Sequence, residues 1–401
     1  MLVAGYQGDG FSSVLVFGHS WASIPSMPID RLPRLIFASS EESADLLYAT
    51  KFSVPDPVLF LRQNGKTTVL LSDLEIDRGK KEAKVDEVIA LSSVEHLLQK
   101  GRKGKPPIEK TIAFFLRQRR VRKAAVPYNF PVGLANGLAK EGISVVSVAG
   151  LFWSEREYKT EGELQSIRRA IRITEIGLAR GMEVLQAAEI KSGKRLVWAG
   201  KALTSEKLRA EIDTAILQAG GTPTGTIVAG GEQACDPHDR GSGPLKADSL
   251  IILDVFPRDA RSGYYGDLTR TVVRGKANEA QRQLWWTVYE AQKLALRKIC
   301  AGGSGGSLQA EVAEFFRQQG YPAEIRDGRW VGFFHGLGHG FGLAIHEQPR
   351  IAKTNFKTGQ VLTVEPGLYF PGVGGVRIED DGVVTEKGFK VLSKFGKQLE
   401  V

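Results

Sequence analysis

The fold is decided by the stretch Leu250-Ile-Ile-Leu-Asp-Val-Phe256, which leads through a polar turn to Tyr264-Tyr-Gly-Asp-Leu-Thr-Arg-Thr-Val-Val273. Both runs are strand-sized and largely apolar. Closed as an antiparallel hairpin about Ala260-Arg261, they would set Asp254 opposite Asp267. Side chains alternate between the two faces of a strand, so both carboxylates would point the same way, with Cβ atoms roughly 4.5–5.5 Å apart.

A second strand pair repeats this arrangement. Val361-Leu-Thr-Val-Glu365 leads to a turn centred on Gly372 and returns through Val376-Arg-Ile-Glu379, which places Glu365 opposite Glu379. Like charges directly opposed on paired strands are destabilising unless a cation lies between them. Solubility does not explain two such pairs in one region. The pattern therefore predicts a metal site.

Histidines add to this prediction. Three of the six lie in one glycine-rich stretch, His335-Gly-Leu-Gly-His339-Gly-Phe-Gly-Leu-Ala-Ile-His346, and His238 precedes the first acidic hairpin. The glycines argue against a helix and predict extended backbone that another backbone or a ligand approaches closely. A single histidine near glycines would more often be a loop residue.

Together the acidic pairs and one imidazole form a candidate ligand set, whereas each residue alone would be unremarkable on a surface. Carboxylates with an imidazole and no thiolate suit Mn, Co, Fe or Zn better than Ca or Mg. The predicted metal ligands are Asp254, Asp267, His339, Glu365 and Glu379.

Around the two strand pairs, the order of elements repeats. Helices are predicted at Thr160–Ala188, opened by a capping box, and at Thr204–Ala219, both before the first pair. Two more are predicted at Asn278–Cys300 and Ser307–Gln319, before the second pair. Helix, helix, strands thus occurs twice, which predicts a duplicated architecture in an α+β fold.

The first part of the chain shows alternating strands and helices and is expected to form a smaller α/β domain. A hairpin is predicted about Asn64-Gly65, and a helix at Glu41–Tyr48 opened by Ser39 or Ser40. We therefore predict domains at residues 1–155 and 156–401. The expected strands are Leu35–Phe37, Val58–Leu61, Thr67–Leu71, Thr111–Leu116 and Ser144–Val148.

Composition places the protein among soluble globular chains. The 401 residues are 42% hydrophobic and 25% charged, close to the average. No apolar run approaches the roughly 20 residues of a membrane-spanning helix, so no membrane association is expected. No Lys or Arg precedes Arg31, which argues against a secretory signal, and the only cysteines are Cys235 and Cys300. These features predict a cytoplasmic location.

The net charge of +9 raises the question of nucleic acid. Two basic clusters contribute, at Lys100–Lys105 and Arg117–Lys123. Neither carries a nucleic-acid-binding signature with interleaved aromatic residues. We interpret them as solvated faces of the N-terminal domain and expect no nucleic-acid partner.

These motifs resemble the pita-bread-fold metallopeptidases of family M24, which include methionine aminopeptidase, Xaa-Pro aminopeptidase, prolidase (Xaa-Pro dipeptidase) and the related creatinase. The resemblance extends from about Lys159 to the C-terminus and favours the Xaa-Pro aminopeptidase and prolidase branch. It implies a C-terminal pita-bread (creatinase/aminopeptidase) fold, two divalent metal ions, a peptide or small amide substrate and a homodimer. It is carried by Ile252–Asp254, Gly266–Thr271, His335–Gly342, Val364–Tyr369 and Val376–Asp380.

The resemblance also implies a role for each ligand. Asp254 would chelate one metal, His339 and Glu365 the other, and Asp267 and Glu379 would bridge the two. Two metals about 3.5–4 Å apart lower the pKa of a shared water to give a hydroxide nucleophile. Glu365 would also carry the proton to the leaving nitrogen.

Five further residues match positions around the family's site. His238 and His346 resemble imidazoles that stabilise the tetrahedral intermediate or its leaving nitrogen. The others would line the site or support a bridging carboxylate, and they are His335, Tyr369 and Arg377.

The sequence departs from the family at the first acidic pair, because Asp254 and Asp267 are thirteen residues apart, slightly more than is usual. We expect the extra residues to lengthen the Arg258–Ser262 turn. Two alternatives to a peptidase stay open. One is a non-peptidase C–N hydrolase of the same fold acting on an ectoine- or creatine-like molecule, and the other is a catalytically inactive binding module.

Overall fold

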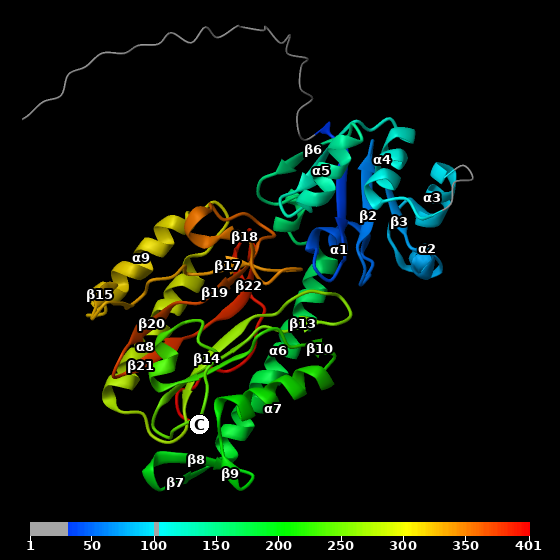
Figure 1. Ribbon diagram of the computed structural model, residues 1–401. Helices are drawn as coiled ribbons and strands as arrows, with labels where there is room; N and C mark the ends of the chain where they lie inside the picture. The colour runs from blue at the N-terminus through cyan, green and yellow to red at the C-terminus, as the bar shows by residue number, and fades with distance from the viewer. Residues whose placement is uncertain (1–30, 100–103) are drawn as a thin grey trace, which may run out of the picture.

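The computed structural model describes residues 31–99 and 104–401. Its N-terminal part is a mixed six-stranded sheet with strand order β4-β3-β2-β1-β5-β6 (Figure 1). The strands are β1 (Arg34–Ala38), β2 (Val58–Gln63), β3 (Lys66–Leu71), β4 (Glu87–Ala90), β5 (Lys123–Pro127) and β6 (Ser144–Val148). The helices are α1 (Ala44–Thr50), α2 (Ile76–Glu82), α3 (Leu91–Gln99), α4 (Ile108–Gln118) and α5 (Val132–Lys140).

Most of the local predictions for this part are confirmed. Strands β2 and β3 form the expected hairpin, and its two turn residues, Asn64 and Gly65, both have positive φ, as a tight two-residue turn requires. The helix after β1 begins later than predicted. Its cap is Ser43, whose hydroxyl accepts the N–H of Leu46 at 3.2 Å.

The strand predicted at Thr111–Leu116 is wrong, because these residues lie in helix α4. A short apolar run does not by itself distinguish a strand from a buried helix. In the structure, Ile112 and Leu116 are buried four residues apart on one helix face, while Arg117 closes the last turn. That spacing is helical rather than alternating.

The C-terminal part confirms the predicted duplication. In the first half, helices α6 (Glu161–Ala187) and α7 (Ser205–Gln218) precede a three-stranded sheet in the order β11-β12-β14. The N-terminus of α6 carries the predicted capping box between Thr160 and Glu163. The strands are β11 (Ile227–Gly230), β12 (Leu250–Val255) and β14 (Leu268–Val273).

In the second half, helices α8 (Glu279–Lys298) and α9 (Gly305–Gln318) precede a five-stranded sheet in the order β18-β17-β19-β22-β23 and a separate hairpin, β20–β21. The strands are β17 (His339–Gly340), β18 (Glu347–Arg350), β19 (Val361–Val364), β20 (Gly367–Phe370), β21 (Gly374–Arg377), β22 (Asp380–Thr385) and β23 (Gly388–Val391). Shorter paired strands are β7 (Glu189–Lys191), β8 (Arg195–Trp198), β9 (Lys201–Ala202), β10 (Gly221–Thr222), β13 (Arg258–Asp259), β15 (Glu324–Arg326) and β16 (Arg329–Val331).

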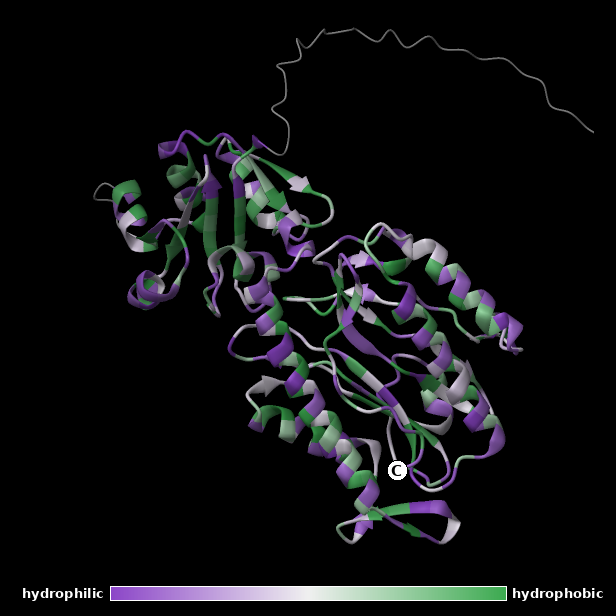
Figure 2. Ribbon diagram, turned by 180° about the vertical axis from the view of Figure 1, so that it is seen from behind, coloured by the Kyte–Doolittle hydropathy of each residue, from purple (hydrophilic) through white to green (hydrophobic). Residues whose placement is uncertain are grey.

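One hydrophobic core lies beneath each helix pair, and each core also includes a few residues of the other half. Figure 2 shows the cause: hydrophobic and hydrophilic residues alternate along the long helices, so each helix presents one apolar face to the strands. The halves join where β14 meets the second half. There the Glu379 N–H donates to the carbonyl of Thr269 (3.1 Å), and the Thr271 hydroxyl donates to the carbonyl of Arg377 (2.9 Å). This seam carries the predicted metal ligands.

The N-terminal sheet and the C-terminal sheets are separate. Within residues 31–99 and 104–401, no strand pair joins them. The two parts are instead connected by a buried ion cluster of Arg156 with Asp45 and Glu347, in which Lys159 also pairs with Glu347 at 3.2 Å. A boundary near residue 155 fits this arrangement and stays a prediction.

Two surface predictions concern charge and the membrane. In the second basic cluster, Arg117 and Arg119 pair with the carboxylates of Glu141 and Glu87. Part of the first cluster, residues 100–103, lies outside the described residues, as does the N-terminal stretch before Arg31. In the described part of the chain, no helix combines the length and apolar character needed to cross a membrane.

Candidate metal centre

Strands β12 and β14 carry the first acidic pair, in a register that differs from the predicted one. Asp254 pairs with Thr269 rather than with Asp267, which lies just before β14. The connection between the strands causes the shift, because its residues Arg258–Asp259 form β13 and pair with β10 instead of continuing the hairpin. A shift of two residues preserves the face on which side chains lie, so Asp254 and Asp267 still face one cavity.

The register predicted for the second pair is confirmed. Strand pairs β19–β22 and β20–β21 flank the two glutamates, and both are centred on Gly372. Continuing either ladder places Glu365 directly opposite Glu379. The single predicted hairpin is, however, divided into two strand pairs at this point. Both carboxylates line the same cavity as the aspartates.

The glycine-rich stretch brings His339 to the carboxylates. Strand β17 lies between β18 and β19, packed so closely that a side chain at Gly338 or Gly340 would collide with backbone: a Cβ at these positions would come within 2.1 Å of the Thr363 carbonyl or 2.3 Å of the Gln348 carbonyl. The prediction of close backbone approach is therefore confirmed. It explains why glycines flank this histidine.

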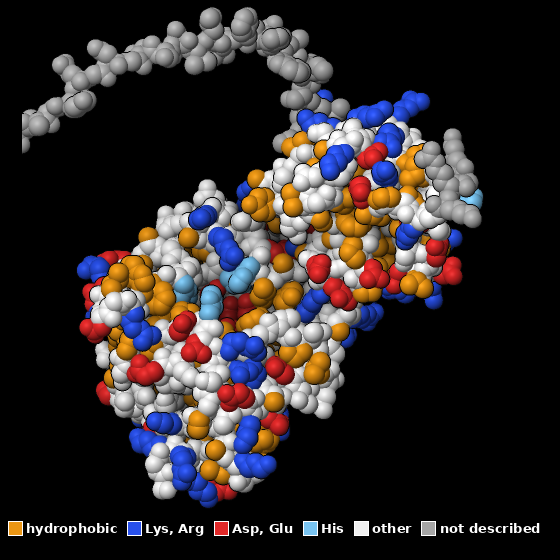
Figure 3. Space-filling model, in the orientation of Figure 1, with side chains coloured by type: hydrophobic (Ala, Val, Ile, Leu, Met, Phe, Trp, Pro, Cys, Tyr) orange, Lys and Arg blue, Asp and Glu red, His pale blue; other side chains and the backbone are white. Residues whose placement is uncertain are grey.

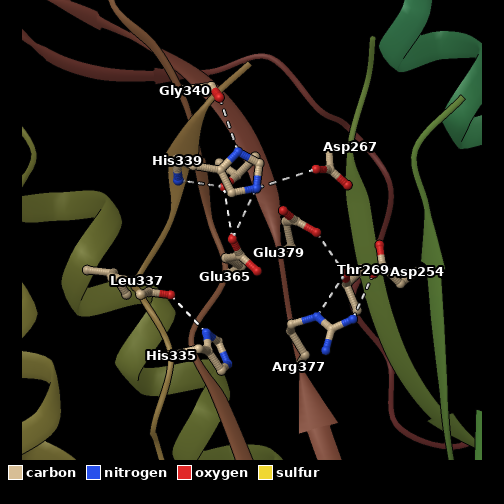
Figure 4. A network of polar contacts seen from close by, with 12 residues as sticks. Asp254, Asp267, Thr269, His335, Leu337, His339, Gly340, Glu365, Arg377 and Glu379 are labelled. Carbon is tan, nitrogen blue, oxygen red and sulfur yellow. Dashed lines mark hydrogen bonds and ion pairs between the residues drawn. The ribbon is translucent and has the colours of Figure 1, made fainter. Parts of the chain in front are cut away.

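The five predicted ligands converge at the seam between the halves (Figure 4). One ligand atom each from Asp267, His339 and Glu379 lie within 4.8 Å of one another. Nε2 of His339 is also 3.4 Å from Oε1 of Glu365. Asp267, His339, Glu365 and Glu379 thus form a compact cluster, and Asp254 lies beside it on the wall of the cavity.

Arg377 supports the cluster from below. Its Nη2 donates to Oδ2 of Asp254 (2.7 Å) and its Nη1 donates to the hydroxyl of Tyr369 (3.1 Å), which lies 2.9 Å from Nε2 of His335. The Thr269 hydroxyl donates to Oε2 of Glu379 at 2.7 Å. His335, Tyr369 and Arg377 thus form one hydrogen-bonded chain that ends on Asp254, and Figure 4 shows the contacts of Arg377 with Asp254 and Thr269.

Burial and mutual repulsion dominate the electrostatics of the cluster. Burial, then the charges of Glu379 and Asp254, raise the pKa of Asp267 well above its usual range. Burial and the charge of Glu365 do the same to the pKa of Glu379. The pKa of Glu365 rises to about 7, chiefly by burial and against the pull of Arg377. One guanidinium does not neutralise four carboxylates.

The imidazole of His339 is set up as a ligand. Burial, then the neighbouring His346, lower its pKa to about 3, so the ring is neutral. Nδ1 lies 3.1 Å from the carbonyl of Gly340, which assigns the proton to Nδ1 and leaves the lone pair of Nε2 facing the carboxylates. The carboxylate oxygens and this lone pair repel one another where no proton lies between them. A bound cation removes the repulsion.

The residues present therefore fit divalent metal ions. The donor set is oxygen-rich with one imidazole, and Oδ1 of Asp254 is buried with no hydrogen-bond partner among the described residues. A buried carboxylate oxygen without a partner is costly unless a metal takes it.

A cavity of about 760 Å³ opens above the cluster. Figure 3 shows it as a hollow with acidic side chains at its floor and histidines around it. His238, His335 and His346 line it, as predicted, whereas Tyr369 lies behind the wall and reaches the site through its hydroxyl. The cavity also has apolar walls, from Phe256 and Phe334 among others.

Sequence reasoning missed several residues of the site. Arg350 and Lys353 line the cavity and, among the described residues, form no ion pair. Asp381, which is fully buried, accepts the backbone N–H of Asp267 at 3.0 Å. Thr269 lies in the motif Gly266–Thr271, which does not by itself mark it as the hydrogen-bond donor to Glu379. For Arg350 and Lys353, the only signal in the sequence is their position a few residues after His346.

The fold and the site together define a class: a duplicated α+β chain with a buried carboxylate–imidazole metal centre at the seam of its halves. The pattern of metallopeptidase family M24 matches residues 165–386, more than half of the chain. The protein belongs to metallopeptidase family M24.

Individual relatives agree with this assignment. The Xaa-Pro dipeptidase of Pyrococcus furiosus is 34% identical over 250 residues, a match that covers 61% of this chain and 65% of that protein, just under two thirds of its length. An X-Pro aminopeptidase from Thermotoga maritima superposes with a TM-score of 0.77 at 23% identity, covering 93% of this chain and 98% of that one. The prolidase from Pyrococcus furiosus gives 0.74 at 25% identity, covering 92% and 98%. The expected pita-bread fold, with an additional N-terminal part, is confirmed.

Proposed function

We propose that this protein is a dinuclear metal-dependent peptidase that hydrolyses N-terminal Xaa-Pro type peptide bonds. The observation that carries the proposal is the buried, charge-uncompensated cluster of Asp267, His339, Glu365 and Glu379 beside Asp254. Family membership and the names of the relatives support the peptidase chemistry and the Xaa-Pro preference.

Each ligand has a proposed place. Asp254 would hold one metal ion, His339 and Glu365 the other, and Asp267 and Glu379 would bridge them. Bound metals supply Lewis acidity, which makes a water nucleophilic near neutral pH and polarises the scissile carbonyl. Thr269 and Arg377 hold Glu379 and Asp254 in orientation through hydrogen bonds of 2.7 Å each.

The chain's own groups would manage the protons. Glu365, a carboxylate on the wall of the cavity, takes the proton of the attacking water and returns it to the leaving nitrogen. His238 and His346 line the cavity above the cluster, where imidazoles would donate to the developing oxyanion or the leaving nitrogen.

The cavity wall suggests how the other end of a substrate is held. Arg350 and Lys353 lack carboxylate partners among the described residues, so they can bind the free C-terminal carboxylate of a short peptide. Phe256 and Phe334 offer apolar surface to a proline ring. These groups favour a dipeptide over a long peptide.

A peptide panel tests the function. The metal-stripped chain, reloaded with Mn²⁺ or Co²⁺, should cleave Leu-Pro faster than the matched control Leu-Ala. C-terminal amidation of Leu-Pro should raise KM if Arg350 and Lys353 hold the carboxylate. Failure on every Xaa-Pro dipeptide and longer Xaa-Pro peptide would contradict the proposal and favour a small C–N substrate of the ectoine or creatine kind.

Three further features complete the proposal. Manganese is the proposed ion, with Co, Zn or Fe as the other candidates, since carboxylate oxygens outnumber the single imidazole. The proposed assembly is a homodimer, as the family resemblance implies. The proposed location is cytoplasmic, supported by a chain with only two cysteines. Metal analysis and light scattering check the first two.

A further inference from the structure

The strands of the glutamate pair are interrupted at one residue. Pro366 follows Glu365 and, in the shared register of the flanking ladders, faces Ile378. The N–H of Ile378 donates to the carbonyl of Pro366 at 3.4 Å, but proline has no N–H to return the bond. The carbonyl of Ile378 therefore lacks the donor that an antiparallel pair would supply.

Gln292 supplies the missing donor. It lies on α8, is fully buried, and donates from Nε2 to the carbonyls of Ile378 (3.0 Å) and Val364 (3.1 Å). These are the residues immediately before Glu379 and Glu365. One side-chain amide thus holds the backbone of both strands at the level of the two carboxylates.

The backbone N–H groups of the two glutamates do not hold the strands together. The N–H of Glu365 donates to the carbonyl of Leu337 at 2.9 Å, and the N–H of Glu379 donates to that of Thr269 at 3.1 Å. Each glutamate is thus bonded away from the other, toward the segments that carry His339 and Asp267. The hydrogen bonds of Gln292 therefore join the two strands at a level where the glutamate N–H groups do not.

The amide is retained at an energetic cost. Oε1 of Gln292 is buried without a hydrogen-bond partner among the described residues, and an unsatisfied buried acceptor costs free energy. A methionine or leucine here would avoid that cost, but it would leave the carbonyl of Ile378 without the donor that Gln292 supplies. Packing of the core therefore does not explain a glutamine at this position.

We propose that Gln292 is a positioning residue that sets the separation of Glu365 and Glu379 and thereby the metal affinity of the centre. This inference rests on the proposed function, because the separation matters only if the two carboxylates share cations.

A matched pair of variants on one helix tests it. Gln292→Met removes the bridge, and Gln281→Met removes another buried α8 amide, which donates to the carbonyl of Asp248 at 3.1 Å. Mn²⁺ affinity of the metal-stripped full chain is measured by calorimetry, alongside Tm. Both variants should lower Tm, and only Gln292→Met should weaken Mn²⁺ binding, by about 10- to 100-fold.

A rescue variant sharpens the test. Pro366→Ala restores an N–H opposite Ile378, so in that background Gln292→Met should cost much less Mn²⁺ affinity. If Gln292→Met alone does not fold, the double variant is compared with Pro366→Ala alone, and similar Mn²⁺ affinities are expected. An undiminished loss in the Pro366→Ala background would contradict the bridging role.

The outcomes separate the two proposals. Equal Mn²⁺ affinity of wild type, Gln292→Met and Gln281→Met would overturn the inference and leave the proposed function standing. A folded wild-type chain that binds none of Mn²⁺, Co²⁺, Zn²⁺ and Fe²⁺ would overturn the proposed function and the inference with it.

Discussion

Two buried carboxylate clusters in this protein have pKa values shifted in opposite directions. At the junction of the two parts, burial acts to raise the pKa of Glu347, but the charges of Lys159 and Arg156 outweigh it and the pKa is lowered. In the metal centre, burial and neighbouring carboxylates raise the pKa of Glu379 and of Asp267. Both clusters are buried, and they differ in whether basic side chains of the protein lie beside the carboxylates.

The difference shows which cluster is complete. Glu347 accepts from Arg156, from Lys159 and from the N–H of Ala344 (2.9 Å), so its charge is neutralised by the chain itself. Among the described residues, Arg377 is the only Lys or Arg side chain that forms an ion pair with a predicted ligand carboxylate. A fold that neutralises one buried carboxylate so fully, yet leaves four others repelling one another, indicates that the missing positive charge comes from outside the chain.

The largest effect is expected from Glu365→Gln, which keeps the volume but removes the proton acceptor of the incomplete cluster. Loss of a general base costs about 10²- to 10⁴-fold in rate, and loss of a ligand adds to this. The kcat on an Xaa-Pro dipeptide should fall by at least that factor at saturating Mn²⁺. Turnover near the wild-type rate would refute the role of Glu365.

The cluster of Glu347 with Arg156 and Lys159 should affect the free energy of unfolding. Glu347→Gln leaves Lys159 buried without its counter-charge and leaves Arg156 with Asp45 alone, which should lower the free energy of unfolding of the metal-free protein by about 3–5 kcal/mol. Glu379→Gln is the matched control, because it removes a repelling charge and should lower that free energy far less. Urea unfolding measures both. Equal losses would mean that the two clusters do not differ as described.

A smaller effect concerns pH. The raised pKa of Glu365, about 7 when folded against roughly 4.3 unfolded, means that the folded state holds the proton more tightly. Its stabilising contribution is present below pH of roughly 4.3 and is lost as the pH rises toward 7. Metal-free Glu365→Gln should therefore show a flatter decline of Tm over this window than wild type. Glu347, with a lowered pKa, contributes the opposite slope, lost only as the pH falls through its folded pKa.

Adding metal should reverse that slope, since ligands must lose their protons to bind. With saturating Mn²⁺, the Tm of wild type should rise from about pH 5 to about pH 7, as metal affinity grows. A slope that is unchanged by Mn²⁺ would argue against carboxylate ligation.

The sequence predicted those parts of the site that depend on local order. The position of Glu365 opposite Glu379 follows from counting residues about Gly372, and the structure has that register. The same counting failed for Asp254 and Asp267, because the connection between their strands pairs elsewhere in the fold. A register can be counted only where the intervening residues form a simple turn.

Residues whose role depends on tertiary packing have no recognisable pattern in the sequence. Gln292 lies within a helix, and a single glutamine fits the amphipathic pattern of that helix without standing out. Only the fold brings its amide to the carbonyls of Val364 and Ile378. Glu347 directly follows His346, yet its partners Arg156 and Lys159 are almost two hundred residues away. The Thr111–Leu116 error has a related cause, since a short apolar run fits either a strand or a helix until its neighbours are known.

The most direct test of the account is the metal content of the folded wild-type chain. After stripping, reloading with Mn²⁺ and removal of free ion, the account predicts two ions per chain and a higher Tm than that of the stripped protein, with the second ion lost in Asp254→Asn. A folded chain that binds no Mn²⁺, Co²⁺, Zn²⁺ or Fe²⁺ would contradict the claim that its buried carboxylates form a metal centre.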